Sequence, residues 1–258
     1  MSTKRSTLIS GNWKMNENHF ESLKLIQELA ALLRAQPISP DQQVSLHPPF
    51  TSLRTVQTAV ETDHLPITLG AQTCHFEDRG AYTGEISAEM LAKLNVVFVL
   101  AGHSERRAHL GETDEIVARK VEAIFRNNMR PILCVGETPE EREDGLAEVV
   151  VERQVRAALG QCSPEQITSC VLAYEPLWAI GTGLTASPQD AQRIGRHLRA
   201  VLREIAGPSA DETLIQYGGS VTPENAAEFL ACPDIDGLLV GGASLDATKF
   251  VAIIHTGE

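Results

Sequence analysis

The feature that most constrains the fold of this chain is a series of short apolar runs. They recur roughly every thirty residues, the length of one strand, one helix and two loops. Several runs are almost entirely apolar rather than alternating, which is typical of parallel strands that helices cover. The pattern therefore predicts eight strand–helix units. The runs are STLISG, VSLHP, ITLGAQ, VVFVLAG, PILCVG, SCVLAY, TLIQYGG and DGLLVGG.

The segments between these runs carry apolar residues at intervals of three or four, the spacing of an amphipathic helix. Residues 18–35 show a clear stripe, and we expect Phe20, Ile26 and Leu29 on its buried side. Similar stripes predict helices over residues 115–127 and 188–205. Strand and helix patterns thus alternate, as βα units require.

Eight such units can close into a barrel or spread into an open sheet. A doubly wound sheet usually carries GxGxxG after its first strand, and no such fingerprint follows STLISG. A closed barrel leaves no strand edge, and 258 residues match its usual length. No linker or change of composition divides the chain. We therefore predict one α/β domain over residues 1–258, a single (β/α)8 barrel.

Charge and composition limit the possible partners and compartments. The net charge of −12 argues against binding to nucleic acid or to an anionic membrane, since the summed field would repel both. The five cysteines are odd in number and lack metal-ligand spacing, so we expect neither a disulfide framework nor a metal site. Without a signal-like or membrane-spanning apolar stretch, the sequence predicts a cytoplasmic protein.

The active site of such a barrel lies at the carboxyl ends of its strands, because the strand-to-helix loops meet there. The first strand exit carries Asn12 and Lys14, the fourth His103 and the sixth Glu175. Alone, a lysine in this position is usually solvated or ion-paired. Beside an amide donor such as Asn12, it suits an anionic substrate that carries a carbonyl oxygen.

The histidine and the glutamate each allow a structural and a catalytic interpretation. The exit after His103 reads SERR, the expected start of a short helix, whose N-terminal dipole favours a neutral imidazole that can donate a hydrogen bond. Glu175 precedes Pro176, where the chain leaves the buried sheet. It could form a buried ion pair with Arg106 or Lys14, but we favour a general base strengthened by desolvation. The other seven histidines lack comparable neighbours and are expected to be structural or solvated.

Two glycine-containing regions complete the predicted site. Residues 176–183, PLWAIGTG, combine a tryptophan with two glycines, which predicts a lid rather than an ordinary packed loop. Glycine pairs at the seventh and eighth strand exits predict a phosphate site built from backbone amides. They comprise Gly218 and Gly219, followed by Ser220, and Gly241 and Gly242.

Read together, several motifs resemble triosephosphate isomerase from the first strand to the last helix. They occur in the order and spacing of that family, so chance similarity of one pattern is excluded. The motifs are GNWKMN, GAYTGEIS, GHSERR, CVGET, AYEPLWAIGTG, YGGSV and LLVGGASL.

The resemblance implies a TIM barrel that interconverts dihydroxyacetone phosphate and D-glyceraldehyde 3-phosphate without a cofactor, in glycolysis and gluconeogenesis. It implies that Glu175 moves the carbon-bound proton, that neutral His103 polarises the carbonyl, and that Lys14 with Asn12 holds the substrate. Glu105 would support this cluster. Amides around Gly181, Ser220, Gly241 and Gly242 would bind the phosphate.

The resemblance also implies a homodimer in which residues 73–83 insert into the partner, with Thr83 near the partner's active site. The sequence departs from the family at Thr73, where asparagine is expected. It departs again at Leu177, where valine is common in the lid hinge. We expect the second change to affect lid closure rather than the chemistry.

Two other functions remain open from the sequence. Another phosphate-binding barrel, such as an aldolase, would use Lys14 as a Schiff-base nucleophile, which borohydride would trap. A catalytically silent barrel that binds a phosphorylated metabolite would be expected to lack the base or the proton donor. Because both Glu175 and His103 are present, we favour the isomerase.

Overall fold

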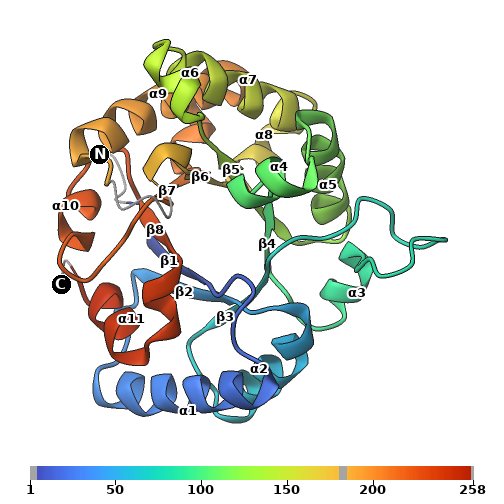
Figure 1. Cartoon of the computed structure of the whole chain (residues 1–258), viewed down its shortest axis with the longest axis vertical. Coiled ribbons are helices and arrows are strands. Elements are labelled where there is room, and N and C mark those ends of the chain that lie inside the picture. The colour runs from blue at the N-terminus through green and yellow to red at the C-terminus, as the bar shows by residue number, and fades with distance from the viewer. Residues whose placement is uncertain (1–4, 180–184, 257–258) are drawn as a thin grey trace.

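The computed structural model describes residues 5–179 and 185–256 of the chain. Its eight strands lie side by side in chain order, each parallel to its neighbours, and they close into a barrel ringed by helices (Figure 1). Closure is made by the first and last strands, where Leu8 pairs with Gly237 and Gly11 with Val240. The prediction of a closed (β/α)8 barrel is therefore confirmed.

The eight predicted runs all contain strands, with these bounds. The strands are β1 (Thr7–Asn12), β2 (Gln42–His47), β3 (Thr68–Ala71), β4 (Phe98–Ala101), β5 (Arg130–Val135), β6 (Val171–Tyr174), β7 (Leu214–Tyr217) and β8 (Gly237–Val240). The α-helices are α1 (His19–Ala35), α2 (Phe50–Thr62), α3 (Ala88–Ala92), α4 (Ser104–Leu110), α5 (Asp114–Arg126), α6 (Pro139–Glu143), α7 (Ala147–Leu159), α8 (Pro164–Ser169), α9 (Pro188–Ala206), α10 (Ala226–Leu230) and α11 (Ala247–Ile254). Among the described residues, the short 3₁₀ helices are η1 (Leu177–Ala179), η2 (Gly207–Glu212) and η3 (Gly242–Leu245).

The three helices predicted from apolar stripes are α1, α5 and α9. A capping box starts α1: the Asn18 side chain accepts from the Glu21 amide, and the Glu21 carboxylate accepts from the Asn18 amide. Ile26 and Leu29 are buried as expected, but Phe20 is 74% exposed. The expectation for Phe20 was wrong because Phe20 is not at a spacing of three or four from the buried positions of α1, which start at Ser22 and Leu25, and so lies on another face of the helix. The apolar residue at this position therefore belongs to the first turn of the helix but not to its buried stripe.

The apolar core has two parts. Alternate strand residues such as Leu8, Phe98 and Ile132 form one compact cluster, and the intervening residues join a larger cluster with the helices. Because side chains alternate across a strand, β1 and β4 to β8 supply both parts, whereas β2 and β3 supply the larger cluster alone. All strands run in one direction, so their carboxyl ends, which carry the predicted site residues, open at the same mouth.

Candidate active site

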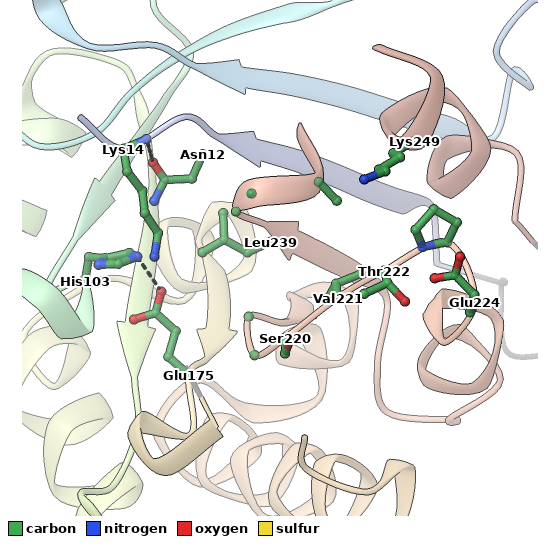
Figure 2. A pocket seen from close by; sticks show the side chains of 16 residues that line it. Asn12, Lys14, His103, Glu175, Ser220, Val221, Thr222, Glu224, Leu239 and Lys249 are labelled. Carbon is green, nitrogen blue, oxygen red and sulfur yellow. Dashed lines mark hydrogen bonds and ion pairs between the residues drawn. The ribbon is translucent and has the colours of Figure 1, made fainter. Parts of the chain in front are cut away.

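A cavity of about 480 Å³ occupies the mouth of the barrel. It brings together residues from the ends of β1, β4, β6, β7 and β8, as Figure 2 shows. The predicted residues that line it are Asn12, Lys14, His103, Glu175, Gly218, Gly219, Ser220, Gly241 and Gly242. Gly181 lies outside the described residues, as do Ile180 and Gly183.

Lys14 adopts an unusual backbone conformation, with φ of 53°. A side chain in the left-handed region is strained, so neighbouring contacts must hold it there. The Lys14 amide donates to Asn12 Oδ1 at 3.0 Å, and Gln72 Nε2 donates to the Lys14 carbonyl at 2.8 Å. Its ammonium pairs with Glu105 Oε1 at 2.5 Å. The strained turn thus directs a paired cation toward the cavity.

Glu105 contacts Lys14 directly. Burial raises the pKa of the Glu105 carboxyl, but the hydrogen bond and charge of Lys14 outweigh this effect, and the pKa lies below its usual value. The carboxylate is therefore charged near neutral pH. It keeps Lys14 paired while leaving the ammonium on the wall of the cavity.

His103 caps the N-terminus of α4. Its Nδ1 accepts a hydrogen bond from the Glu105 amide at 3.2 Å. Since that nitrogen acts as acceptor, it carries no proton, and a neutral ring bears its proton on Nε2. Nε2 lies 3.2 Å from Glu175 Oε1. The local fold thus selects the tautomer whose N–H points into the site.

Glu175 is only 1% exposed, although it lines the cavity. Its Oε2 accepts from the Ser104 amide at 2.7 Å, and its Oε1 is the oxygen nearest to His103. The alternative of an ion pair with Arg106 or Lys14 is not what the structure shows. Arg106 instead pairs with Glu112, and Lys14 pairs with Glu105. Glu175 is held by the Ser104 amide, whereas its Oε1 lies 3.2 Å from His103 Nε2 without a hydrogen bond among the described residues.

The far half of the cavity is formed by backbone at the ends of β7 and β8. A Cβ at Gly219 would lie 2.1 Å from the Tyr217 hydroxyl, so only glycine fits there. A Cβ at Gly242 would meet no atom within 4 Å. The exposed Lys249 of α11 also lines this half, which the sequence analysis missed. Helical spacing gave no sign of it, because α11 reaches the cavity only in the closed barrel.

The start of the predicted lid is tied to the exit of β5. Trp178 Nε1 and the Tyr174 hydroxyl both donate to Glu137 Oε1, at 2.8 and 3.0 Å. The Arg142 guanidinium stacks 3.5 Å from the centre of the Trp178 indole ring. The sequence analysis quoted CVGET but did not single out Glu137. Its role depends on a contact across 41 residues, which no local pattern reveals.

The predicted interface loop is anchored on its own chain. Thr73 Oγ1 accepts from Lys120 Nζ at 2.9 Å, so the unexpected threonine has a polar partner. The Arg119 guanidinium lies 3.5 Å from the centre of the Phe76 ring. Phe76 is therefore half-buried against its own helix α5, whereas Tyr82 remains 45% exposed.

Neither a membrane-crossing helix nor a cluster of metal-binding side chains occurs in the described part of the chain. Across residues 5–179 and 185–256, no helix is both long and apolar enough to cross a membrane. Within the same ranges, no three His, Cys, Asp or Glu side chains are placed to hold a metal ion.

Fold and site together define a (β/α)8-barrel enzyme of the acid–base type, with a glutamate, a histidine and a lysine around one cavity. The sequence model of the triosephosphate isomerase family matches residues 7–257. The chain belongs to the triosephosphate isomerase family.

Relatives support this assignment over nearly the whole length. A triosephosphate isomerase of Streptomyces avermitilis is 51% identical over 252 residues, which cover 97% of both chains. One from Roseiflexus sp. (strain RS-1) is 49% identical with the same coverage. One from Mycobacterium leprae is 47% identical and covers 98% of both chains.

Proposed function

We propose that this chain interconverts dihydroxyacetone phosphate and D-glyceraldehyde 3-phosphate by proton transfer through an enediolate. The observation that carries the proposal is the pairing of Glu175 with His103. A buried carboxylate lies 3.2 Å from Nε2 of an imidazole whose Nδ1 accepts a backbone hydrogen bond, and both line a cavity that also holds a lysine. A glutamate base with a neutral histidine is the known arrangement of this family.

In the proposed reaction, Glu175 takes a proton from the carbon next to the carbonyl and returns it to the neighbouring carbon. His103 donates its Nε2 proton to the carbonyl oxygen and then takes the proton of the adjacent hydroxyl. The ring thus ends the cycle neutral. Lys14 and Asn12 hold the substrate, and the ammonium stabilises the negative charge of the enediolate. No net proton is gained or lost.

The phosphate group would occupy the glycine-lined half of the cavity. Backbone amides at Ser220, Gly241 and Gly242, with Gly181 of the lid, would bind its oxygens. Lys249 at the rim adds a positive charge to a molecule of net charge −12. A local cationic site is what an acidic protein needs to capture an anionic substrate.

A coupled assay tests the reaction directly. Purified protein given glyceraldehyde 3-phosphate should produce dihydroxyacetone phosphate, which a coupling dehydrogenase reports. Borohydride with substrate should leave Lys14 unmodified, because its ammonium is ion-paired to Glu105. A trapped adduct on Lys14 would favour the Schiff-base aldolase. Saturable binding of the triose phosphate without turnover would favour a silent metabolite-binding barrel.

The proposed assembly is a homodimer formed through residues 73–83. This loop projects from the barrel beyond α3 (Figure 1). Besides the exposed Tyr82, Met15 next to Lys14 is 95% exposed, and covering both would bury apolar surface. Thr83 would then approach the partner's active site. A cytoplasmic location accords with the five unpaired cysteines.

A further inference from the structure

His47, the last residue of β2, places an imidazole inside the barrel close to its mouth. The ring is fully buried, and its residue pairs directly with Asn12 on β1. The space for the ring comes from β3: a Cβ at Gly70 would lie 2.3 Å from His47 Nδ1 and Cε1. The histidine and the glycine are therefore sterically matched. The site described above gives His47 no role.

The hydrogen bonds of His47 fix its protonation. Nδ1 lies 3.2 Å from the Ala71 carbonyl oxygen, which can only accept, so Nδ1 carries the proton. Nε2, the nitrogen without a proton, then lies 3.1 Å from the Ser45 hydroxyl. Ser45 is hydrogen-bonded to Ser10, which accepts from Gln216 Nε2, both at 2.8 Å. Burial lowers the pKa of His47 to about 4, so the ring is neutral near pH 7.

The bond from His47 to Ala71 acts on the strand exit that supports Lys14. Gln72 follows Ala71, and its Nε2 donates both to the Lys14 carbonyl at 2.8 Å and to the His47 carbonyl at 2.9 Å. The Trp13 amide also donates to the His47 carbonyl, at 3.2 Å. Thus the side chain of His47 contacts Ala71, and its backbone contacts Trp13, which precedes Lys14, and Gln72, which holds the strained Lys14 backbone.

We propose that His47 is a positioning residue for Lys14. Its ring fixes the Ala71 peptide, so that the Gln72 amide can hold the Lys14 carbonyl and keep the lysine in its left-handed conformation. The inference rests on the proposed isomerase function, in which the Lys14 ammonium binds the substrate. A purely structural role for His47 would predict lower stability with unchanged kinetic constants.

Two substitutions separate these roles. Asparagine at position 47 keeps a nitrogen donor near the position of Nδ1, whereas leucine has a similar volume but no donor. With His47→Leu, we expect kcat/KM for glyceraldehyde 3-phosphate to fall roughly ten- to hundredfold, since misplacing a catalytic group by about 1 Å costs on that order. His47→Asn should recover most of this loss.

Ser45→Ala is the matched control, because it removes the partner of Nε2 and leaves the bond to Ala71. It should lower Tm without changing kcat/KM.

A second measurement does not depend on activity. The Lys14 backbone amide resonance should shift in His47→Leu and stay near its original position in His47→Asn and Ser45→Ala. A folded His47→Leu variant with unchanged kcat/KM and an unchanged Lys14 resonance would overturn the proposal. If the unmodified protein lacks isomerase activity, the proposed function fails, and the resonance still decides whether His47 positions Lys14. Should His47→Leu not fold, Gly70→Ala forces the ring away from Ala71 and must produce the same shift.

Discussion

The proton on His103 is set by one backbone amide. Because the Glu105 N–H occupies Nδ1, the ring proton is on Nε2, the nitrogen that lies 3.2 Å from Glu175 Oε1. Glu175 in turn is oriented by the Ser104 amide. The start of α4 therefore orients both partners of the proposed proton transfer, and small displacements there should affect turnover more than binding.

Shortening the base by one methylene should expose this dependence. In Glu175→Asp, the charge remains but the carboxylate withdraws, so we expect kcat to fall on the order of a hundredfold with little change in KM. Steady-state kinetics of the parent protein and of Glu175→Asp measure the effect. Glu224→Asp, at an exposed carboxylate on the same cavity, is the control and should keep full activity. Unchanged turnover in Glu175→Asp would remove this residue from the mechanism.

The phosphate half of the cavity predicts a binding effect instead. A Cβ at Gly242 meets no protein atom, so Gly242→Ala should keep the stability of the parent. Its methyl group would project where the phosphate is expected and raise KM. Inorganic phosphate should compete with the substrate in the parent protein and less well in the variant. Noncompetitive inhibition would place the anion site elsewhere.

At the scale of elements, η1 is held to β5 and β6 through a buried carboxylate. Glu137 accepts from Tyr174 on β6 and from Trp178 on η1. Burial, reinforced by the charge of Glu137, raises the pKa of Tyr174, so the phenol keeps its proton and donates. If residues 176–183 act as the predicted lid, η1 would be its fixed start, and closure would have to break these bonds or take place in the residues after η1.

Removing this carboxylate should destabilise the protein. In Glu137→Ala, the buried Tyr174 hydroxyl loses its acceptor, which should lower the free energy of unfolding by about 1–3 kcal/mol. Urea denaturation measures the change. Glu143→Ala on the exposed face of α6 should change the free energy by less than about 0.5 kcal/mol. Equal stability of the two variants would show that Glu137 does not anchor η1.

At the scale of the whole molecule, assembly and activity should be coupled. If residues 73–83 insert into a partner, Thr83→Glu places a charge against the partner's surface, at a cost of several kcal/mol, on the order of other unpaired buried charges. We expect a monomer without activity, and sedimentation with kinetics can test both. Thr58→Glu, on an exposed position of α2, should remain dimeric. A fully active unmodified monomer at micromolar concentration would contradict the interface.

The buried imidazole of His47 predicts how stability depends on pH. Burial lowers its pKa from 6.5 to about 4 in the folded protein. The His47 ring of the unfolded chain therefore takes up its proton at a higher pH than the ring of the folded protein. The contribution of the neutral buried ring to stability is complete above pH 6.5 and is lost as the pH falls toward 4. The shift corresponds to roughly 3 kcal/mol. Urea denaturation from pH 7.5 to 4.5, at fixed protein concentration, should show a steeper loss for the parent than for His47→Asn. Parallel curves would contradict a neutral buried ring.

The sequence by itself determined the eight strand–helix units and the position of the predicted site residues at the strand exits. Apolar runs and turn residues are local signals. Since parallel strands all end on the same side, they bring Lys14, His103 and Glu175 to one mouth independently of the exact positions of the helices. Closure into a barrel, by contrast, required the pairing of β1 with β8, 229 residues apart between Leu8 and Gly237.

Only the tertiary structure decided which side chains hold these residues in place. The contacts of Glu137 with Trp178, of His47 with Ala71 and Gly70, and of Gln72 with Lys14 join separate strands. They depend on register and on the distance between side chains, and neither property is encoded in local periodicity. The sequence therefore specified where the reactive groups emerge, whereas packing between strands determined their orientation, their tautomers and their burial.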